Sequence, residues 1–181
     1  MKSIADVNVN RNLSSPNKPY KHFKSKSIIE KSEMMGALEK WGKGLLSISR
    51  AHLNKEDYIS IAKQMLEDIY AFKEGDILFK PTLASIRPFR TTFDSALSYF
   101  VGGNEKFSED RGFALNPWVN VEFEIAGVIT SEKQGLVMGN KILKQLNGNI
   151  TVANFTMGFI RCSNGELKIN LHHSSLPYTP S

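Results

Sequence analysis

The chain has a single cysteine, Cys162. No disulfide can therefore form within it, and a zinc site built from several cysteines is excluded. No apolar run approaches the roughly 20 residues that a membrane-spanning helix needs. The first residues also lack the apolar segment of a secretory signal. These absences fit a reducing compartment, and we expect a cytoplasmic protein that does not contact membranes.

Several catalytic signatures are missing as well. The sequence contains no glycine-rich phosphate loop with its lysine, no GxSxG nucleophile elbow and no HExxH zinc motif. Of its four histidines, His172 and His173 are adjacent, and neighbouring residues of a strand point to opposite faces. One ion cannot easily bind both, so the sequence predicts no metal site.

Positive charge is concentrated at the N-terminus. The net charge is +5, and residues 1–32 carry seven Lys and Arg against Asp6 and Glu30. Residues 1–27 are rich in Asn, Ser, Pro and Lys without periodicity, which predicts a flexible basic arm before a single domain over residues 28–181. No nucleic-acid motif surrounds these lysines, so we expect no nucleic-acid partner. Contact with a nucleic acid or a membrane surface, or a targeting role, stays an alternative for the arm.

The first half of the domain has helical periodicity. An apolar stripe predicts a helix over residues 28–49. A second helix is predicted from the cap Asn54 to Gly75, followed by a short strand over residues 76–80. Thr92 is expected to begin a third short helix, which Gly102-Gly103 ends.

The second half has the pattern of strands. We expect them over residues 112–115, 117–129, 134–146, 150–162 and 166–175. Asn147-Gly148 and Asn164-Gly165 predict hairpins with type I′ turns. Three glycines inside the strands indicate bulges or bends: Gly127, Gly139 and Gly158. The predicted fold class is α+β, a curved, cone-shaped antiparallel sheet with three helices over one face and a cavity between the layers.

The last strand ends in a polar run, His172-His173-Ser174-Ser175. Leu167, Ile169 and Leu171 are apolar at alternate positions, which predicts that odd-numbered residues face the interior. His173 and Ser175 would then point into the cavity, with His172 and Ser174 on the other face. A polar patch at a strand end is the alternative; a Ser-His hydrolase is disfavoured because adjacent residues rarely reach each other correctly.

Two further hydroxyls are candidates for the cavity. Thr82 follows Pro81 after the short strand, and Tyr99 lies beside Phe100 in the third predicted helix. Their alternatives are a turn or cap for Thr82 and half-buried packing for Tyr99.

Four segments in order carry a resemblance to a known family: Leu78–Thr82, Ala96–Gly103, Met138–Asn140 and Leu171–Tyr178. Over roughly residues 30–178 the chain resembles the iota-class carbonic anhydrases, and the HHSS-x-P ending is specific to them. The resemblance implies a nuclear transport factor 2-like cone, usually dimeric, and reversible hydration of carbon dioxide to bicarbonate.

The resemblance also implies site residues. Some members are described as metal-free and others as using manganese or zinc; the missing ligand set favours a metal-free enzyme without a cofactor. Thr82, Tyr99 and Ser175 correspond best to the bicarbonate-binding hydroxyls, and we include His172 and Ser174 among the substrate-binding candidates. We further expect His173 to accept the proton, since imidazole titrates near neutral pH.

Two other functions share this fold. One is a non-catalytic small-molecule-binding or oligomerisation module, which an assay of carbon dioxide hydration would distinguish. The other is an isomerase or cyclase, which needs a carboxylate in the cavity. Glu122 and Glu124 are the only strand carboxylates in that region, and their register turns them away from it.

Overall fold

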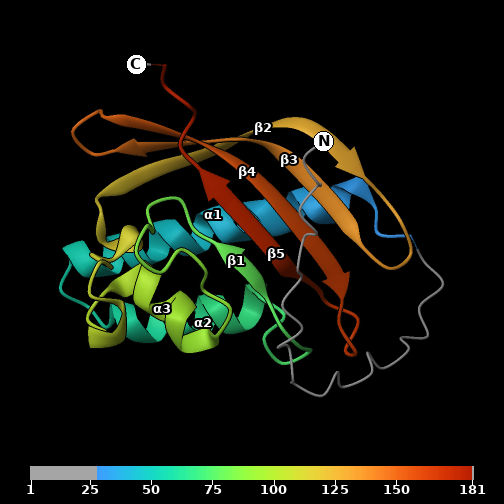
Figure 1. The fold of residues 1–181 in the computed structure, drawn as a ribbon, viewed down its shortest axis with the longest axis horizontal. Coiled ribbons are helices and arrows are strands. Elements are labelled where there is room, and N and C mark those ends of the chain that lie inside the picture. The colour runs from blue at the N-terminus through green and yellow to red at the C-terminus, as the bar shows by residue number, and fades with distance from the viewer. Residues whose placement is uncertain (1–27, 181) are drawn as a thin grey trace, which may run out of the picture.

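The computed structural model describes residues 28–180, so the predicted N-terminal arm lies outside the described residues. Three helices and five strands make up the domain, and short 3-10 turns follow the third helix (Figure 1). The elements are α1 (Lys31–Leu53), α2 (Tyr58–Ile69), β1 (Leu78–Lys80), α3 (Phe93–Val101), η1 (Glu105–Phe107), η2 (Phe113–Leu115), β2 (Trp118–Ile129), β3 (Gly135–Gln145), β4 (Ile150–Arg161) and β5 (Leu167–Ser175).

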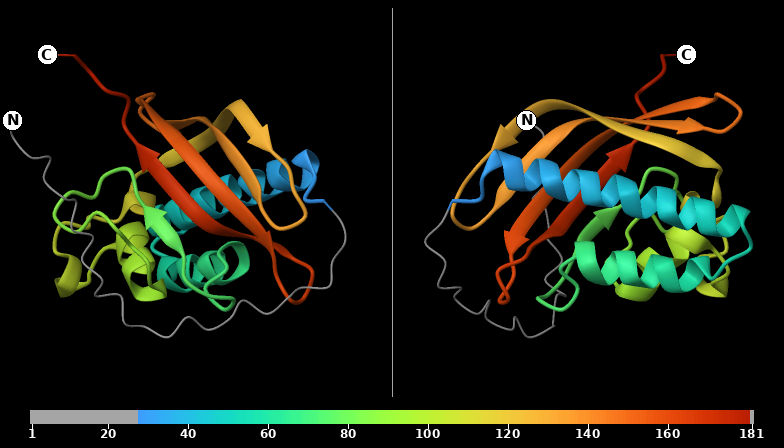
Figure 2. Two further views of the ribbon diagram at one scale, coloured as in Figure 1. Left: turned by 45° about the vertical axis from the view of Figure 1, so that its right-hand side comes forward. Right: turned by 180° about the vertical axis from the view of Figure 1, so that it is seen from behind.

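The strands form one twisted sheet in the order β1-β5-β4-β3-β2. Its four long strands are antiparallel, as predicted. The short strand β1 differs, because it runs parallel to β5 at the sheet edge and makes the sheet mixed. The helices lie on one side of the sheet, and α1 crosses it diagonally (Figure 2). The predicted α+β layering is confirmed.

Helix boundaries follow the capping chemistry. The third helix is confirmed, with Thr92 accepting a hydrogen bond from the Ser95 amide and Gly102 closing it at φ 67°. The prediction of Asn54 as the cap of α2 is wrong, because the Asp57 carboxylate accepts from the Ser60 amide instead. This helix also ends at Ile69, before the predicted Gly75.

Both predicted hairpins are present, but their turn type differs from the prediction. Gly148 and Gly165 have φ of 88° and 87°, whereas the preceding asparagines keep negative φ. The Gly148 amide donates to the Gln145 carbonyl, and the Gln145 amide donates to the Asn149 carbonyl. This is a type I turn followed by a left-handed glycine bulge, and the second hairpin repeats the pattern.

One predicted strand is absent. Residues 113–115 form the 3-10 turn η2, whose end is held by Trp118: its indole N–H donates to the Phe113 carbonyl at 2.8 Å. The bulges predicted at Gly127 and Gly158 coincide with shifts of register in the β2–β3 and β4–β5 ladders.

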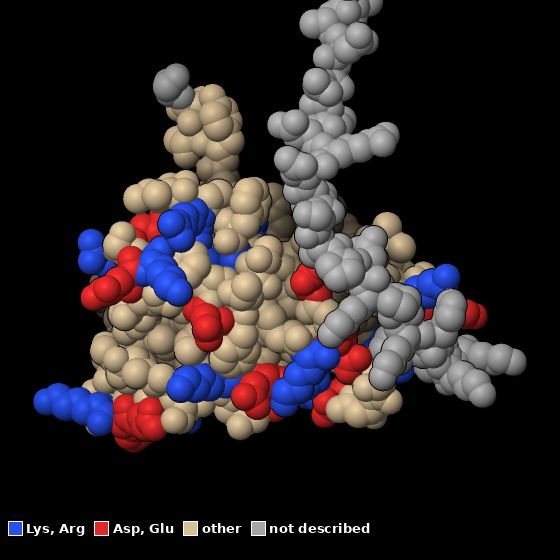
Figure 3. Space-filling model, turned by 60° about the horizontal axis from the view of Figure 1, so that its bottom comes forward, with Lys and Arg blue, Asp and Glu red and all other residues tan. Residues whose placement is uncertain are grey.

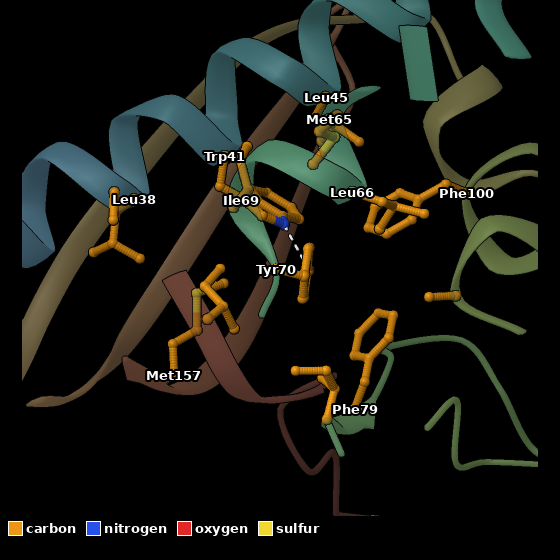
Figure 4. Close-up of a cluster of buried hydrophobic side chains, with 14 of the residues drawn as sticks. Leu38, Trp41, Leu45, Met65, Leu66, Ile69, Tyr70, Phe79, Phe100 and Met157 are labelled. Carbon is orange, nitrogen blue, oxygen red and sulfur yellow. Dashed lines mark hydrogen bonds between the residues drawn. The ribbon is translucent and has the colours of Figure 1, made fainter. Parts of the chain in front are cut away.

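The core fills the space between the helices and the sheet. Trp41 of α1 is its centre, surrounded by residues of α2, β1, α3 and β4 (Figure 4). Gly44 lets α1 approach α2 closely, because a Cβ there would meet the Met65 side chain. Burial of this apolar surface, at about 25 cal/mol per Å², holds the helical layer on the sheet. No helix among residues 28–180 combines the length and the hydropathy of a membrane span.

Candidate active site

The polar run of β5 is inserted into the fold with the opposite orientation to the one predicted. His172 and Ser174 are each 1% exposed, whereas His173 is exposed and Ser175 is half-buried. The prediction that His173 and Ser175 point to the interior is therefore wrong. The cause is the register shift against β4: Phe159 pairs with Ile169 and Gly158 with Leu171, so Asn170 is an extra residue. A bulge of this kind reverses the inward alternation from odd to even positions.

His172 and Ser174 belong to a chain of buried hydrogen bonds. The Trp41 indole lies 3.0 Å from the Tyr70 hydroxyl, which lies 2.7 Å from His172 Nδ1. His172 Nε2 is 3.1 Å from Ser174 Oγ. Figure 4 shows Trp41 and Tyr70 pointing toward each other across the core. Phe79 of β1 stacks on the imidazole, with ring centroids 4.9 Å apart, and fixes its plane.

This series of hydrogen bonds ends at the amine of a lysine that the sequence patterns did not single out. Lys141 of β3 is 2% exposed, and its Nζ lies 2.9 Å from Ser174 Oγ. It occupies an inward position between the buried Val137 and Leu143. A lysine in the apolar phase of a strand was the available signal, because lysine is rarely buried without a partner.

Burial controls protonation throughout this cluster. It lowers the pKa of Lys141 to about 7, because the charged form loses its hydration. Desolvation, together with the neighbouring Lys141, also holds the pKa of His172 well below its usual value. Burial raises the pKa of Tyr70 and that of Tyr99, so both phenols keep their protons near neutral pH.

Thr82 and Tyr99 lie next to each other on the helical side of the sheet. They are 8% and 5% exposed, and Tyr99 contacts Phe79, the residue that stacks on His172. Burial raises the pKa of Tyr99, and the nearby backbone amide of Leu83 and the Thr82 hydroxyl and amide oppose this only in part. Neither hydroxyl, however, has hydrogen-bond geometry with any group in residues 28–180. Two buried hydroxyls without partners are uncommon, since burial of an unpaired polar group costs free energy.

A buried ion pair holds the loop that carries Thr82. Arg90 is fully buried and donates to Asp110 at 2.8 Å, and its backbone amide donates to the Phe79 carbonyl. Asp110 also accepts from Ser98 of α3 at 2.6 Å. Glu109 accepts the backbone amides of residues 85–87, and these bonds lower its pKa to about 2. The loop after β1 is thereby fixed to α3.

His173 and Ser175 line a shallow hollow on the outer face of the sheet. Asn140, Asn154 and Thr156 share it, and its volume is about 280 Å³. Glu122 and Glu124 are exposed on the same outer side, as their register predicted. The structure thus separates the six predicted site residues into two groups. Four lie on the helical side (Thr82, Tyr99, His172, Ser174), and two lie on the outer face.

The described residues form neither a cluster of metal ligands nor, on the face drawn in Figure 3, a strongly charged surface patch. Within residues 28–180 no three His, Cys, Asp or Glu side chains are grouped as an ion would require. Lysines and arginines lie beside acidic residues on the face drawn in Figure 3, without a broad patch of one sign.

These features define an α+β domain with a cluster of buried polar side chains between its helices and its sheet. A sequence model of the family described as metal-independent carbonic anhydrase matches residues 32–176. The chain belongs to this family. A metal-independent carbonic anhydrase of Nostoc sp. (strain PCC 7120) is 40% identical over 153 residues, covering 83% of this chain and 75% of the relative.

Solved structures agree with this assignment. The crystal structure of an iota-carbonic anhydrase from a cyanobacterium, complexed with bicarbonate, superposes with a TM-score of 0.82 at 40% identity. The match covers 84% of this chain and 94% of that one. A putative calcium/calmodulin-dependent kinase association domain from Thiobacillus denitrificans gives a TM-score of 0.52 at 11% identity, with 80% and 94% covered, and shares the fold alone. The predicted resemblance to iota-class carbonic anhydrases is confirmed.

Proposed function

We propose that this member of the carbonic anhydrase family hydrates carbon dioxide to bicarbonate on the helical side of β5. The observation that carries the proposal is the pair of buried, unpartnered hydroxyls of Thr82 and Tyr99. Their hydrogen-bonding capacity is left for a small ligand, and bicarbonate offers three oxygens to such donors. The bicarbonate bound in the cyanobacterial relative supports this choice of ligand.

The chemistry of the donors suits an oxyanion. Burial raises the pKa of Tyr99, so its phenol stays a neutral O–H donor. Donors fixed in a water-poor site stabilise the charge that develops on oxygen during hydration. We assign Thr82 and Tyr99 to bicarbonate binding, together with Ser174 and His172, because the bulge in β5 turns these last two inward.

His173 was predicted to accept the proton and Ser175 to bind bicarbonate. Because both line the outer hollow, they could do so only if bicarbonate bound there. The hollow is lined by both polar and apolar side chains, and in a single copy of the chain it lies open on the sheet surface. It lacks the desolvated hydroxyls that make the inner site suitable. We therefore favour the inner site, and a pair of serine variants described in the Discussion tests the choice.

Stopped-flow measurement of carbon dioxide hydration on chelator-treated protein tests the activity. We expect catalysis above the buffer rate after chelation and no increase on adding manganese or zinc. The family's description as metal-independent supports this expectation. Activity only with added metal would contradict the metal-free assignment, and no activity under either condition would favour the non-catalytic binding module.

We also propose a cytoplasmic homodimer without a nucleic-acid or membrane partner. Met138 and Val152 expose apolar surface on the outer face of the sheet, which supports an interface between two copies there. Light scattering coupled to size exclusion tests the dimer. Replacing Met138 with Lys should produce monomers if the sheet face is the interface.

A further inference from the structure

We propose that Lys141 is the proton acceptor of the hydration step and acts through the Ser174 hydroxyl, as a positioning residue that does not touch the substrate. The inference rests on the proposed function. It assigns a task to a buried amine that no family resemblance had indicated.

The surroundings of Lys141 are unusual for a lysine. Its Nζ lies 2.9 Å from Ser174 Oγ, 3.4 Å from His172 Nε2 and 4.6 Å from the centre of a Trp41 ring. None of the carboxylates in residues 28–180 forms an ion pair with it. The titratable groups nearby carry no negative charge. They are His172 on β5 and Lys80 on β1, whose Nζ donates to the Ser174 carbonyl. A permanently charged ammonium would therefore be poorly compensated here.

The hydrogen bonds around His172 and Ser174 also accommodate a neutral amine. The Trp41 indole nitrogen can only donate, so the Tyr70 oxygen accepts from it and its own proton goes to His172 Nδ1. A neutral His172 must then carry its proton on Nε2 and donate to Ser174 Oγ. A protonated Lys141 donates to Ser174 Oγ across the 2.9 Å contact, and a neutral Lys141 can accept the Ser174 proton across the same contact. When the amine is neutral, the hydrogen bonds run one way, from Trp41 to the lysine.

The pKa of Lys141, which burial lowers to about 7, agrees with an amine that can lose its proton near neutral pH. The Trp41 ring also stabilises the protonated form of Lys141. Once protonated, the ammonium lies over an aromatic face, which stabilises a desolvated cation. The site therefore suits an amine that alternates between its two forms.

The proposed step balances as follows. A water oxygen bonds to the carbon of carbon dioxide, and one C=O π pair moves onto oxygen. A water proton passes to Ser174 Oγ while the serine proton passes to Lys141 Nζ. The products are bicarbonate and the Lys141 ammonium, which releases its proton to buffer before the next turnover. The reverse reaction uses the same groups in reverse order.

The test compares the wild type with K141M, K141R and K144M, measured by stopped flow between about pH 6 and 9. Methionine keeps roughly the length of the side chain without a basic amine, and arginine keeps the charge but cannot release a proton at these pH values. Lys144 is an exposed lysine of the same strand and serves as the control. We expect K141M and K141R to lose roughly 100-fold or more in kcat with a smaller change in KM, and to lose the rise in rate near neutral pH. K144M should match the wild type.

Two results would overturn the inference: K141R with wild-type rate, which would show that charge alone is needed, or K141M with an unchanged pH profile. A second readout does not depend on activity or on the stability of the variants. In ¹⁵N spectra of wild-type lysine side chains, one amine should titrate near neutral pH, and K141M should lack that signal. If every lysine of the wild type titrates in the ordinary range, Lys141 is not the acceptor. Absence of hydration by the wild type would instead contradict the proposed function.

Discussion

Tyr70 and His172 are 102 positions apart in the chain, and their side chains meet at 2.7 Å between the phenol oxygen and Nδ1. Tyr70 follows the last residue of α2, and His172 lies in β5. The contact connects the helical layer to β5 through one hydrogen bond. Since Tyr70 also accepts from Trp41, its hydroxyl sets which imidazole nitrogen carries the proton.

Replacing Tyr70 with Phe should therefore damage both stability and activity. The variant leaves the Trp41 indole and His172 Nδ1 buried without partners, which costs about 1–3 kcal/mol in the free energy of unfolding. It also frees His172 to change tautomer, so we expect a lower kcat. Urea unfolding and stopped flow measure the two effects. Y58F, at the half-buried tyrosine that begins α2, should leave both unchanged.

Ser174→Ala and Ser175→Ala distinguish the inner site from the outer hollow. The two serines are adjacent, but one faces the helices and the other the outer surface. We expect S174A to lose most of the activity and S175A to retain it. The reverse result would move bicarbonate binding to the hollow with His173 and would contradict the site proposed above.

Thr82→Val should lower activity without lowering stability. Its hydroxyl is buried and has no partner in the described part of the chain, so removing it in an isosteric change relieves a desolvation cost. We expect an unchanged or higher melting temperature together with weaker bicarbonate binding. A lower melting temperature of the variant would show that the hydroxyl has a structural partner instead.

Asp110→Ala should destabilise the fold strongly. It leaves the fully buried Arg90 without its shorter carboxylate contact, and breaking one partner of a buried pair costs about 3–5 kcal/mol. Loss of the anchor also releases the loop that holds Thr82, so activity should fall as well. K43A, which removes an exposed pair with Glu39, is the control and should not change the unfolding midpoint.

Lys141 gives stability a specific pH dependence. Its pKa is about 7 in the folded chain but about 10.4 when unfolded, so between these values only the unfolded chain binds the proton. The free energy of unfolding should rise with pH across this window by about 1.4 kcal/mol per unit, and be flat below pH 7 as far as this group is concerned. Unfolding curves of wild type and K141M over this range measure the difference. Parallel pH dependences would show that Lys141 has an ordinary pKa when folded.

Local chemistry made much of the fold predictable. Thr92 and Gly102 define α3 because a hydroxyl cap and a left-handed glycine act within one turn. The glycines of the two hairpins fix where β3 and β4 turn back, although the turn type depended on the asparagine backbone. Sequence patterns also placed the four long strands within one residue of their observed ends.

The orientation of the site was not predictable from the same patterns. It depends on the extra residue near Asn170, which the apolar alternation of β5 does not reveal because Leu171 continues it. Lys141 was missed for a related reason. Its importance arises from Ser174 and Trp41, which are brought to it only by the pairing of strands and the crossing of α1.

The bulge in β5 decides which residues of the run His172–Ser175 face the interior. Each residue type in the run His172–Ser175 occurs twice in succession. A slip of one position would exchange the inner and outer faces, yet it would still present one imidazole and one hydroxyl to Lys141. Because each residue type is doubled, an imidazole and a hydroxyl face the interior in either register. A single His-x-Ser would not provide this redundancy.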